Sequence, residues 1–302
     1  MSAPRHIPPS APDASKAAAP AAPRRRRSLK GILPYLGILV GLVIVGFYPA
    51  SEAIDAWRRD QVAVELDQRA ATLDTSQKDE LLAQARAYNE CLAGDEPEIA
   101  EQDIWPYERQ LSPDGADTPF AYVIIPGIDL TMPVYHGTDD AALSAGVGHL
   151  EYTSLPIGGV STHAVLSAHS GMSGMRAFDE IDQLHEGDVF GIRVLGDLYC
   201  YRVTGSEVVL PDETGSLAIR PGEDLCTLVT CTPYGVNDHR LLVHAERCEV
   251  PDGFGQAAAS PATVITNKRV WPLLVAIVAI VLVFALVNHR RRSGRPRQMD
   301  KE

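Results

Sequence analysis

A cysteine at the end of an apolar run has the setting of a nucleophile. The run Thr227-Leu-Val-Thr-Cys231 is typical of a β-strand, and Pro233 and Gly235 follow it at turn positions. Cys231 is therefore expected where a strand ends, held rigidly by the strand but open to a groove. A buried structural thiol or a disulfide partner would fit the same position.

A histidine has a matching setting on another predicted strand. The run His163-Ala-Val-Leu-Ser-Ala leads into His169, and Gly171 then marks a turn. An ordinary cysteine thiol, with a pKa near 8.5, is only slightly ionised at pH 7, so a neighbouring histidine is the usual means of forming the thiolate. We interpret His169 as this partner. The alternative is a surface or core histidine, which is how we interpret His163.

An arginine completes the candidate set. Arg240 opens the apolar run Arg240-Leu-Leu-Val, and residues 232–239 form a short return from Cys231. Such a hairpin brings Arg240 back beside Cys231, where a guanidinium could stabilise the oxyanion of a tetrahedral intermediate. An arginine at a strand edge, paired with an acid, is the competing interpretation.

The elements that would hold these residues are mostly β-strands. Short apolar runs alternate with Gly and Pro at intervals of about 8–12 residues, which indicates a β-barrel or sandwich. A helical arm is expected over 52–93, and short helices over Asp139–Gly146 and Arg176–Leu184. Strands are predicted at Ala121–Ile125, Leu130–Val134, His163–Ala168, Val189–Val194, Tyr199–Leu210, Cys226–Cys231 and Arg240–Ala245.

Two long apolar segments flank this body. Residues 31–51 and 270–288 contain no charged residue, and their lengths of 21 and 19 residues match the hydrocarbon core of a bilayer. Arg24–Arg27 precede the first segment and Arg290–Arg292 follow the second, so the positive-inside rule puts both termini in the cytoplasm and 52–269 outside. A cleaved signal peptide is the alternative for the first segment, and a buried core helix for the second.

Composition narrows the classes of function. The 302-residue chain has a formal net charge of −12, and residues 51–269 alone hold 14 basic and 36 acidic residues. This excess of acid argues against a nucleic-acid-binding protein. The five cysteines form no CxxC pair and no EF-hand pattern occurs, so we expect neither a metal site nor a cofactor.

Together these motifs resemble the sortases, the cysteine transpeptidases of Gram-positive surfaces. The segment 227–243 is similar to their signature around the catalytic cysteine and arginine. Two membrane segments and a helical arm also fit class C, the pilin-polymerising branch. The further similarity to class C covers roughly 120–248 and lies in the strings Pro133–Gly137, Gly146–Glu151, Thr153–Gly159, His163–His169 and Leu228–Gly235.

The resemblance implies an eight-stranded sortase β-barrel. In it Cys231 would be the nucleophile, His169 the general acid/base and Arg240 the stabiliser of the oxyanion or the substrate, and Thr230 would help to position the substrate. The substrate would be a pilin or surface protein with an LPxTG-like sorting signal, cleaved between Thr and Gly. A pilin lysine would then resolve the thioester, and no nucleotide is required. The family's Gly-His-Arg-Gly turn reads Ala-His-Ser170-Gly in this chain.

Class C also implies a lid over the active site. Its usual Asp-Pro-aromatic triplet has its closest counterpart in Asp103-Ile-Trp105-Pro, within the loop 94–119. We interpret Asp103 as a partner for Arg240 and Trp105 as a cover for Cys231. An ordinary tryptophan on the barrel surface is the alternative.

Two other functions stay open. A housekeeping sortase would join surface proteins to a peptidoglycan amine, and a membrane-anchored receptor or adhesin would carry a degenerate, inactive set. The remaining cysteines are Cys91, Cys200, Cys226 and Cys248, which allow three full pairings. We predict Cys226–Cys248 first, because the resemblance puts them on neighbouring strands, with free thiols as the alternative.

The predicted organisation has eight parts in chain order. They are a disordered basic tail (1–30), a transmembrane helix (31–51), the helical arm (52–93), the lid loop (94–119), the catalytic barrel (120–250), a linker (251–269), a second transmembrane helix (270–288) and a basic tail (289–302).

Overall fold

The fold is known from a computed structural model, which describes residues 41, 61–112, 115, 118–171 and 177–254. The chain divides into two compact units, 1–46 and 47–302, and all of these residues except Gly41 belong to the second. Apart from Gly41, the predicted membrane segments at 31–51 and 270–288 lie outside the described residues. Among the helices that are described, none combines the length and apolarity needed to cross a membrane.

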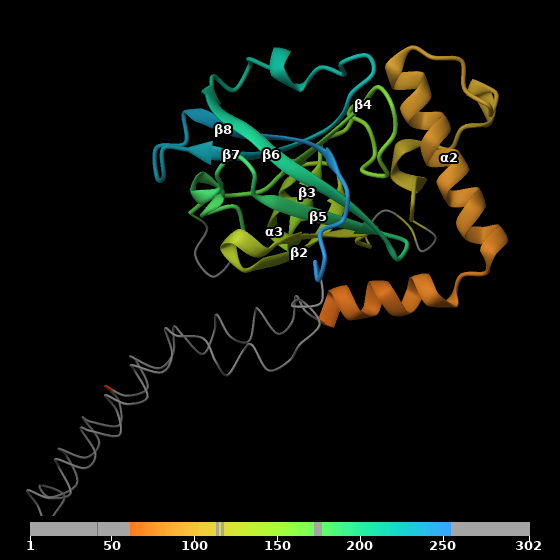
Figure 1. The fold of residues 1–302 in the computed structure, drawn as a ribbon, viewed down its shortest axis with the longest axis horizontal. Helices are drawn as coiled ribbons and strands as arrows, with labels where there is room; N and C mark the ends of the chain where they lie inside the picture. The colour runs from red at the N-terminus through yellow and green to blue at the C-terminus, as the bar shows by residue number, and fades with distance from the viewer. Residues whose placement is uncertain (1–40, 42–60, 113–114, 116–117, 172–176, 255–302) are drawn as a thin grey trace, which may run out of the picture. The chain divides into compact units, whose positions relative to one another are not determined.

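Within the described residues, eight strands close into a barrel in the order β1-β2-β3-β4-β7-β8-β6-β5 (Figure 1). Two neighbouring pairs, β2–β3 and β4–β7, are parallel, and the others are antiparallel. The strands are β1 Ala121–Ile125, β2 Leu130–His136, β3 Val147–His149, β4 Thr162–Ser167, β5 Val189–Val194, β6 Asp197–Val209, β7 Asp224–Thr232 and β8 His239–Cys248. The predicted mostly-β, eight-stranded barrel is confirmed.

The agreement between the predicted and the observed ranges differs from element to element. Seven strands and the helix α3 (Asp140–Ala145) lie within a few residues of the predicted ranges, whereas the three-residue β3 has no counterpart among them. The predicted helix over Arg176–Leu184 is wrong, since its described part contains only the 3-10 turn η5 (Ile181–Gln183). The reason is local: the amide of Phe178 donates to the carbonyl of His169, and Asp179 accepts from the amide of Gly171. These bonds tie the segment to the turn after β4.

The strands that carry the candidate site residues are buried on both faces. Leu166 of β4 and Leu228 of β7 point into the main core of the barrel. Val165 and Val229, one residue away on the same strands, join Leu242 of β8 in a second apolar cluster on the outer face. Such two-sided burial explains why β4 and β7 read as nearly continuous apolar runs. It also holds their ends rigidly.

The helix α2 (Thr75–Ala93) is fixed at both ends and along its length. Asp74 and Gln77 form a reciprocal capping box at its start, and Gly94 ends it in a left-handed conformation, with φ of 79°. The Asn89 carboxamide bonds both backbone groups of Leu155, donating to its carbonyl at 3.1 Å and accepting from its amide at 2.7 Å. The helix is thereby anchored to the loop between β3 and β4.

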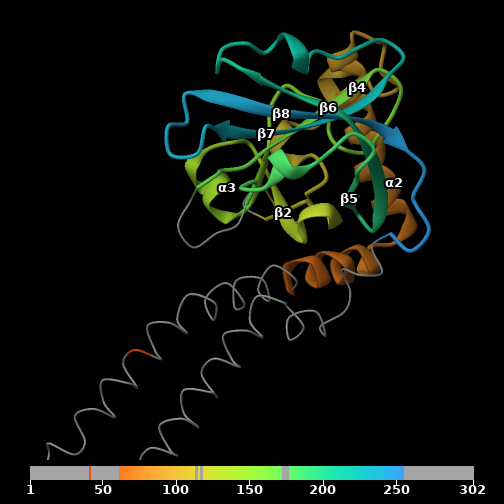
Figure 2. The same cartoon turned by 60° about the vertical axis from the view of Figure 1, so that its left-hand side comes forward.

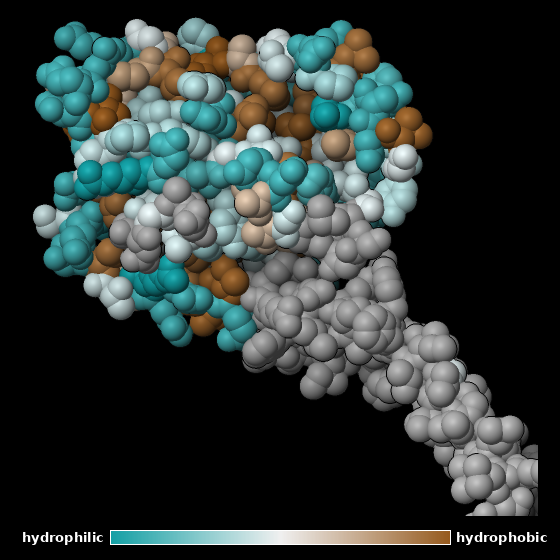
Figure 3. Space-filling model, turned by 180° about the vertical axis from the view of Figure 1, so that it is seen from behind, coloured by the Kyte–Doolittle hydropathy of each residue, from teal (hydrophilic) through white to brown (hydrophobic). Residues whose placement is uncertain are grey.

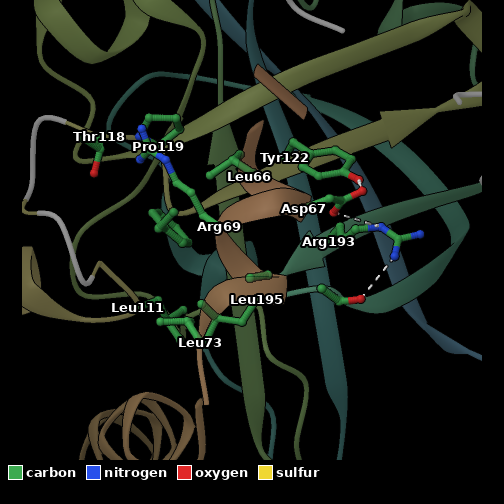
Figure 4. Close-up of a pocket in the computed structure, with 13 residues that line it drawn as sticks. Leu66, Asp67, Arg69, Leu73, Leu111, Thr118, Pro119, Tyr122, Arg193 and Leu195 are labelled. Atoms are coloured by element: carbon green, nitrogen blue, oxygen red, sulfur yellow. Dashed lines mark hydrogen bonds and ion pairs between the residues drawn. The ribbon is translucent and has the colours of Figure 1, made fainter. Parts of the chain in front are cut away.

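A preceding helix over 61–72 lies against β1 and β5. Asp67 on this helix accepts a 2.8 Å hydrogen bond from the Tyr122 hydroxyl and lies 3.9 Å from Nε of Arg193. A small cavity of about 30 Å³ remains between the helix and the barrel, with these three residues and Leu66 on its walls (Figure 4). Burial and the bond to Asp67 raise the pKa of Tyr122. This cavity belongs to the packing of the arm and contains none of the candidate catalytic residues.

Two buried histidines hold the loop before β1 on the barrel. Nε2 of His149 lies 2.9 Å from the Ser154 carbonyl, which can only accept, so this nitrogen carries the proton. Nδ1 of His149 is therefore unprotonated, and it lies 2.9 Å from the Tyr107 hydroxyl, which also donates to the His149 backbone carbonyl at 2.9 Å. His136 packs between the rings of Tyr107 and Phe120, with centroids at 5.0 and 4.4 Å. Burial lowers the pKa of both histidines to about 4, so both are neutral at pH 7.

The five cysteines are all free thiols in the structure. The predicted Cys226–Cys248 disulfide is wrong, because the two side chains face opposite sides of the barrel wall. Cys226 lies in the interior core opposite Ala245 of β8, and Cys248 is three residues further along that strand. Residues three apart in a strand point to opposite faces.

The surface is mixed in polarity. On the face opposite to that of Figure 1, hydrophilic residues cover much of the described barrel, and apolar residues are interspersed among them (Figure 3). Two of the exposed apolar side chains, Tyr234 and Val236, lie in the turn between β7 and β8, and they are 74% and 65% exposed.

Candidate active site

Cys231 and Arg240 lie directly opposite each other. They are register partners on the antiparallel strands β7 and β8, next to the turn that joins the two. The turn closes because the amides of Val236 and Asn237 both donate to the Pro233 carbonyl. Directly opposed residues of an antiparallel pair have their side chains on the same face and within contact range. The hairpin expected from the sequence therefore brings the thiol and the guanidinium together.

His169 is placed from the other side of β7. The strands β4 and β7 run parallel, and Ser167 at the end of β4 pairs with Val229. Beyond that pair, the Ala168 amide donates to the Val229 carbonyl at 3.1 Å. His169 is the next residue, two beyond the end of β4, so continuing the register puts it at the level of Cys231, the second-last residue of β7. The order β4–β7–β8 puts the cysteine strand between the histidine and the arginine.

Strand alternation sets all three side chains on one face. Val165, Val229 and Leu242 form the outer cluster, and His169, Cys231 and Arg240 are each an even number of residues from one of them. All three candidate residues are half-buried, while the outer cluster beneath the same face is buried. The arrangement is a row of three reactive groups that a peptide can reach from outside the barrel.

Two hydrogen bonds clamp the backbone around His169. On one side, the Thr230 hydroxyl donates to the Ala168 carbonyl at 2.8 Å. On the other side, the Ser170 hydroxyl donates to the Cys231 carbonyl at 2.6 Å. Both peptide neighbours of the histidine are thus bonded to residues of β7, at Cys231 or next to it. The clamp fixes the histidine relative to the cysteine.

The clamp changes the role expected for Thr230. This residue is only 4% exposed, and its hydroxyl is engaged under the histidine turn. Its hydroxyl therefore helps to hold the His169 turn in place, and its side chain is too buried to contact a substrate. The sequence showed Ser170 only as a departure from the family's Gly-His-Arg-Gly turn, and no role was predicted for it.

Arg240 is oriented by backbone carbonyls. Its Nη1 donates to the carbonyl oxygens of Asn237 at 3.2 Å and His239 at 3.0 Å. Among the described residues, no carboxylate lies within ion-pair distance of this guanidinium. The structure therefore does not support the competing interpretation, in which Arg240 pairs with an acid. A half-exposed guanidinium without a carboxylate partner can donate hydrogen bonds to a developing oxyanion.

The rim of the site is formed by a contact between two turns. Gly171, two residues after His169, has a φ of +78°, and a side chain there would come within 2.9 Å of the Tyr234 ring. The absence of a side chain at Gly171 lets the Tyr234 ring lie against the histidine turn. Tyr234 was quoted in the cysteine motif but was not expected as a site residue.

The structure does not place the predicted lid residues at this site. Gln84 of α2 holds both, since its carboxamide donates to the Asp103 carbonyl at 3.4 Å and accepts from the Trp105 amide at 2.8 Å. The Arg109 guanidinium lies over the Trp105 ring, with the guanidinium carbon 3.9 Å from the ring centroid. The helix α2 lies on the side of the barrel away from the β7–β8 turn (Figures 1 and 2). The expected contacts of Asp103 with Arg240 and of Trp105 with Cys231 are not formed.

Comparison with known proteins finds similarity to one family. A model of the sortase domain matches residues 123–248. Sortase A of Streptococcus agalactiae is 28% identical over 127 residues, which are 41% of this chain and 51% of that protein. Sortase D of Bacillus subtilis is 25% identical over 126 residues, 41% of this chain and 61% of that protein. The matched region thus spans about half to three fifths of these relatives.

Solved structures match over more of their length. Sortase C1 from Streptococcus agalactiae is 37% identical with a TM-score of 0.58, covering 63% of this chain and 100% of that one. A Clostridium perfringens sortase C, determined with the C-terminal cell wall sorting motif, is 36% identical with a TM-score of 0.56, covering 63% and 99%. Sortase C-1 from Actinomyces oris is 44% identical with a TM-score of 0.51, covering 57% and 98%.

Proposed function

The chain belongs to the sortase family of cysteine transpeptidases, and on that premise we propose that it is a class C enzyme that joins pilin subunits. The observation that carries the proposal is the placement of Cys231 on β7 between Arg240 on β8 and His169 just beyond the end of β4. The similarity to several class C structures over nearly their whole length supports the choice of class.

The first half of the proposed reaction forms a thioester. The Cys231 thiolate attacks the threonine carbonyl carbon of an LPxTG-like signal, and the resulting oxyanion develops beside the Arg240 guanidinium. When this intermediate collapses, the Thr–Gly bond breaks and the protonated His169 gives its proton to the leaving glycine amine. The released polypeptide carries the new amino terminus, and the cysteine carries the acyl group.

The second half transfers the acyl group. A lysine amine of another pilin loses a proton to the neutral His169 and attacks the thioester carbonyl. Collapse of the second tetrahedral intermediate forms an isopeptide bond and returns the Cys231 thiolate. One amide bond is broken and one is formed, so the cycle needs no nucleotide and no cofactor.

The proposed location follows from the sequence. Helices at 31–51 and 270–288 would anchor the chain at both ends, with both termini in the cytoplasm and the barrel outside. A substrate protein displayed on the outer surface of the cell would then meet the site without crossing the membrane. A lid made by Asp103 and Trp105 stays a prediction, and it requires their segment to leave α2.

The test of transpeptidase chemistry is an intact-mass measurement. The full chain in detergent is incubated with an LPxTG peptide, alongside Cys231→Ala and the control Cys91→Ser, which removes a half-exposed thiol of α2. We expect an acyl adduct and a released glycine-terminated fragment with the wild type and the control, and neither with Cys231→Ala. No adduct in any form, with peptides of several sorting-signal sequences, would favour the inactive receptor.

The class is tested by the acceptor. The acylated enzyme is offered either a lysine-containing pilin domain or a peptidoglycan stem peptide, at equal concentration. Class C predicts isopeptide formation with the pilin lysine at least tenfold faster than with the stem peptide. The reverse order would assign the chain to housekeeping anchoring and leave the thioester chemistry intact.

A further inference from the structure

The end of the last barrel strand sets two thiols opposite each other. Cys248, the final residue of β8, is the register partner of Cys200 on β6. Opposed Cα atoms in an antiparallel pair are about 4.5–5.5 Å apart, and disulfides span Cα distances of about 4.4–6.8 Å. The backbone therefore already has the spacing that a disulfide needs.

The two side chains point to the same face. Tyr199 and Tyr201, on either side of Cys200, pack with the barrel core, so Cys200 points outward. Its partner Cys248 must do the same, because directly opposed residues share a face. The pKa of the Cys200 thiol is raised to about 11, by burial first and then by the neighbouring Cys248, which agrees with close approach of the two groups.

The chain after β8 returns to the strand that pairs with Cys200. Phe254 packs against Gly191 of β5, where an added side chain would come within 2.6 Å of the phenyl ring. Gly191 is the register partner of Cys200 on that side, so residues 249–254 turn back across β6 and β5, as the blue segment shows (Figure 1). Cys200 is fully buried, whereas Cys248 is half-buried and open to reagents.

We propose that Cys200 and Cys248 are an oxidation site, at which a protein thiol oxidase outside the cytoplasm forms a disulfide between β6 and the end of β8. The Cys248 thiolate attacks the oxidant's disulfide, which forms a mixed disulfide and releases one thiolate of the oxidant. The Cys200 thiolate then attacks the Cys248 sulfur and displaces the oxidant's second thiolate. Two electrons and two protons pass from the cysteines, and the oxidant leaves as a dithiol.

This site is separate from the catalytic thiol. Arg240 and Cys248 are at opposite ends of β8, eight residues apart, which is about 27 Å along a strand. Cys231 lies beside Arg240, so it is far beyond the reach of the pair. Oxidation of Cys200 and Cys248 thus leaves the nucleophile in place. The inference uses the proposed location outside the cytoplasm, but it does not depend on transpeptidase activity.

The test uses the full chain, first reduced and then equilibrated with oxidised and reduced glutathione. A Cys231→Ala background keeps the catalytic thiol out of the reaction. We expect a mass loss of about 2 Da in most molecules and a proteolytic fragment pair that contains Cys200 linked to Cys248. Reduction of the disulfide should lower the melting temperature by roughly 10 °C, since the bond closes a long loop.

Two variants keep the outcome unambiguous. In Cys248→Ser and in Cys200→Ala, the reductant-dependent change in melting temperature should vanish, whereas it should persist in Cys91→Ser. A stable glutathione adduct on Cys248 with no link to Cys200 would overturn the proposal. A link between any other two cysteines, or a folded protein that stays fully reduced, would overturn it also.

Discussion

The hydrogen bond from Ser170 to the Cys231 carbonyl offers a sharp test of how the site is held. Ser170→Ala removes one hydroxyl and changes the side-chain volume little, so the strands and the three reactive groups are left in place. What is lost is the 2.6 Å link between the residue after the histidine and the nucleophile itself. Among the described residues, the histidine turn then keeps its bonds on the Ala168 side, the bond from Phe178 to His169 and the bond from Gly171 to Asp179.

The size of the effect follows from that single bond. A hydrogen bond of this kind contributes about 0.5–1.5 kcal/mol net. If the whole of it serves to align His169 with Cys231 in the transition state, kcat/KM falls roughly 2- to 13-fold. The loss should appear in kcat with KM nearly unchanged, because the bond positions catalytic groups and does not bind substrate.

The assay is steady-state cleavage of a fluorogenic LPxTG peptide by the full chain. Ser170→Thr is the matched control, since it keeps the hydroxyl and should recover most of the rate. Combination with Thr230→Val, which removes the other half of the clamp, should give a loss that differs from the product of the single losses, because both bonds act on His169. An unchanged kcat in Ser170→Ala, or equal losses in Ser170→Ala and Ser170→Thr, would refute the clamp.

Three further predictions concern other parts of the structure. Arg240→Lys should lower kcat/KM about 10²-fold, because an ammonium lacks the planar fork that the carbonyls of Asn237 and His239 orient; peptide cleavage measures this, and a loss below threefold would contradict the role. Trp105→Ala should change the acylation rate less than twofold, since the ring packs on Arg109; a tenfold rise would show that the segment does act as a lid. The folded-state pKa of His136 and His149 is about 4, below the unfolded value near 6.5, so stability should be complete above pH 6.5 and decline by about 2 kcal/mol per histidine by pH 5. Denaturant titrations should show this decline, and His136→Phe, which suits its aromatic neighbours, should remove about half of it; an unaltered pH dependence would contradict the assignment.

The sequence predicts well those features that depend only on neighbouring residues, such as strands and the turns between them. The β7–β8 hairpin follows from an apolar run that meets Pro233 and Gly235 and then resumes at Arg240, so the opposition of Cys231 and Arg240 could be expected. The position of His169 depends on a parallel pairing between distant strands, which no local pattern reveals. Only the family resemblance linked it to the cysteine, and the Ser170 bond could not be foreseen without that pairing.

A tertiary contact explains why the expected contacts of the lid segment are not formed. Nothing in the loop 94–119 shows that Gln84, on the preceding helix, supplies both a donor and an acceptor to the Asp103–Trp105 segment. The wrong disulfide has a different origin. Neighbouring strands were correctly inferred for Cys226 and Cys248. A disulfide also requires that the two cysteines be opposite each other and on the same face of the sheet. These two conditions can be judged only from the register of β6, β7 and β8.

The position of β7 has a mechanical consequence. A polypeptide held as the proposed thioester on Cys231 would pull on β7, which lies between β4 and β8 and is paired with both. Tension along the strand is therefore shared by two ladders and resisted in shear, so many hydrogen bonds must fail together. An edge strand under the same tension could peel away one bond at a time. The proposed acyl chain would thus be attached at a point of the barrel that can bear force without losing its strand pairing.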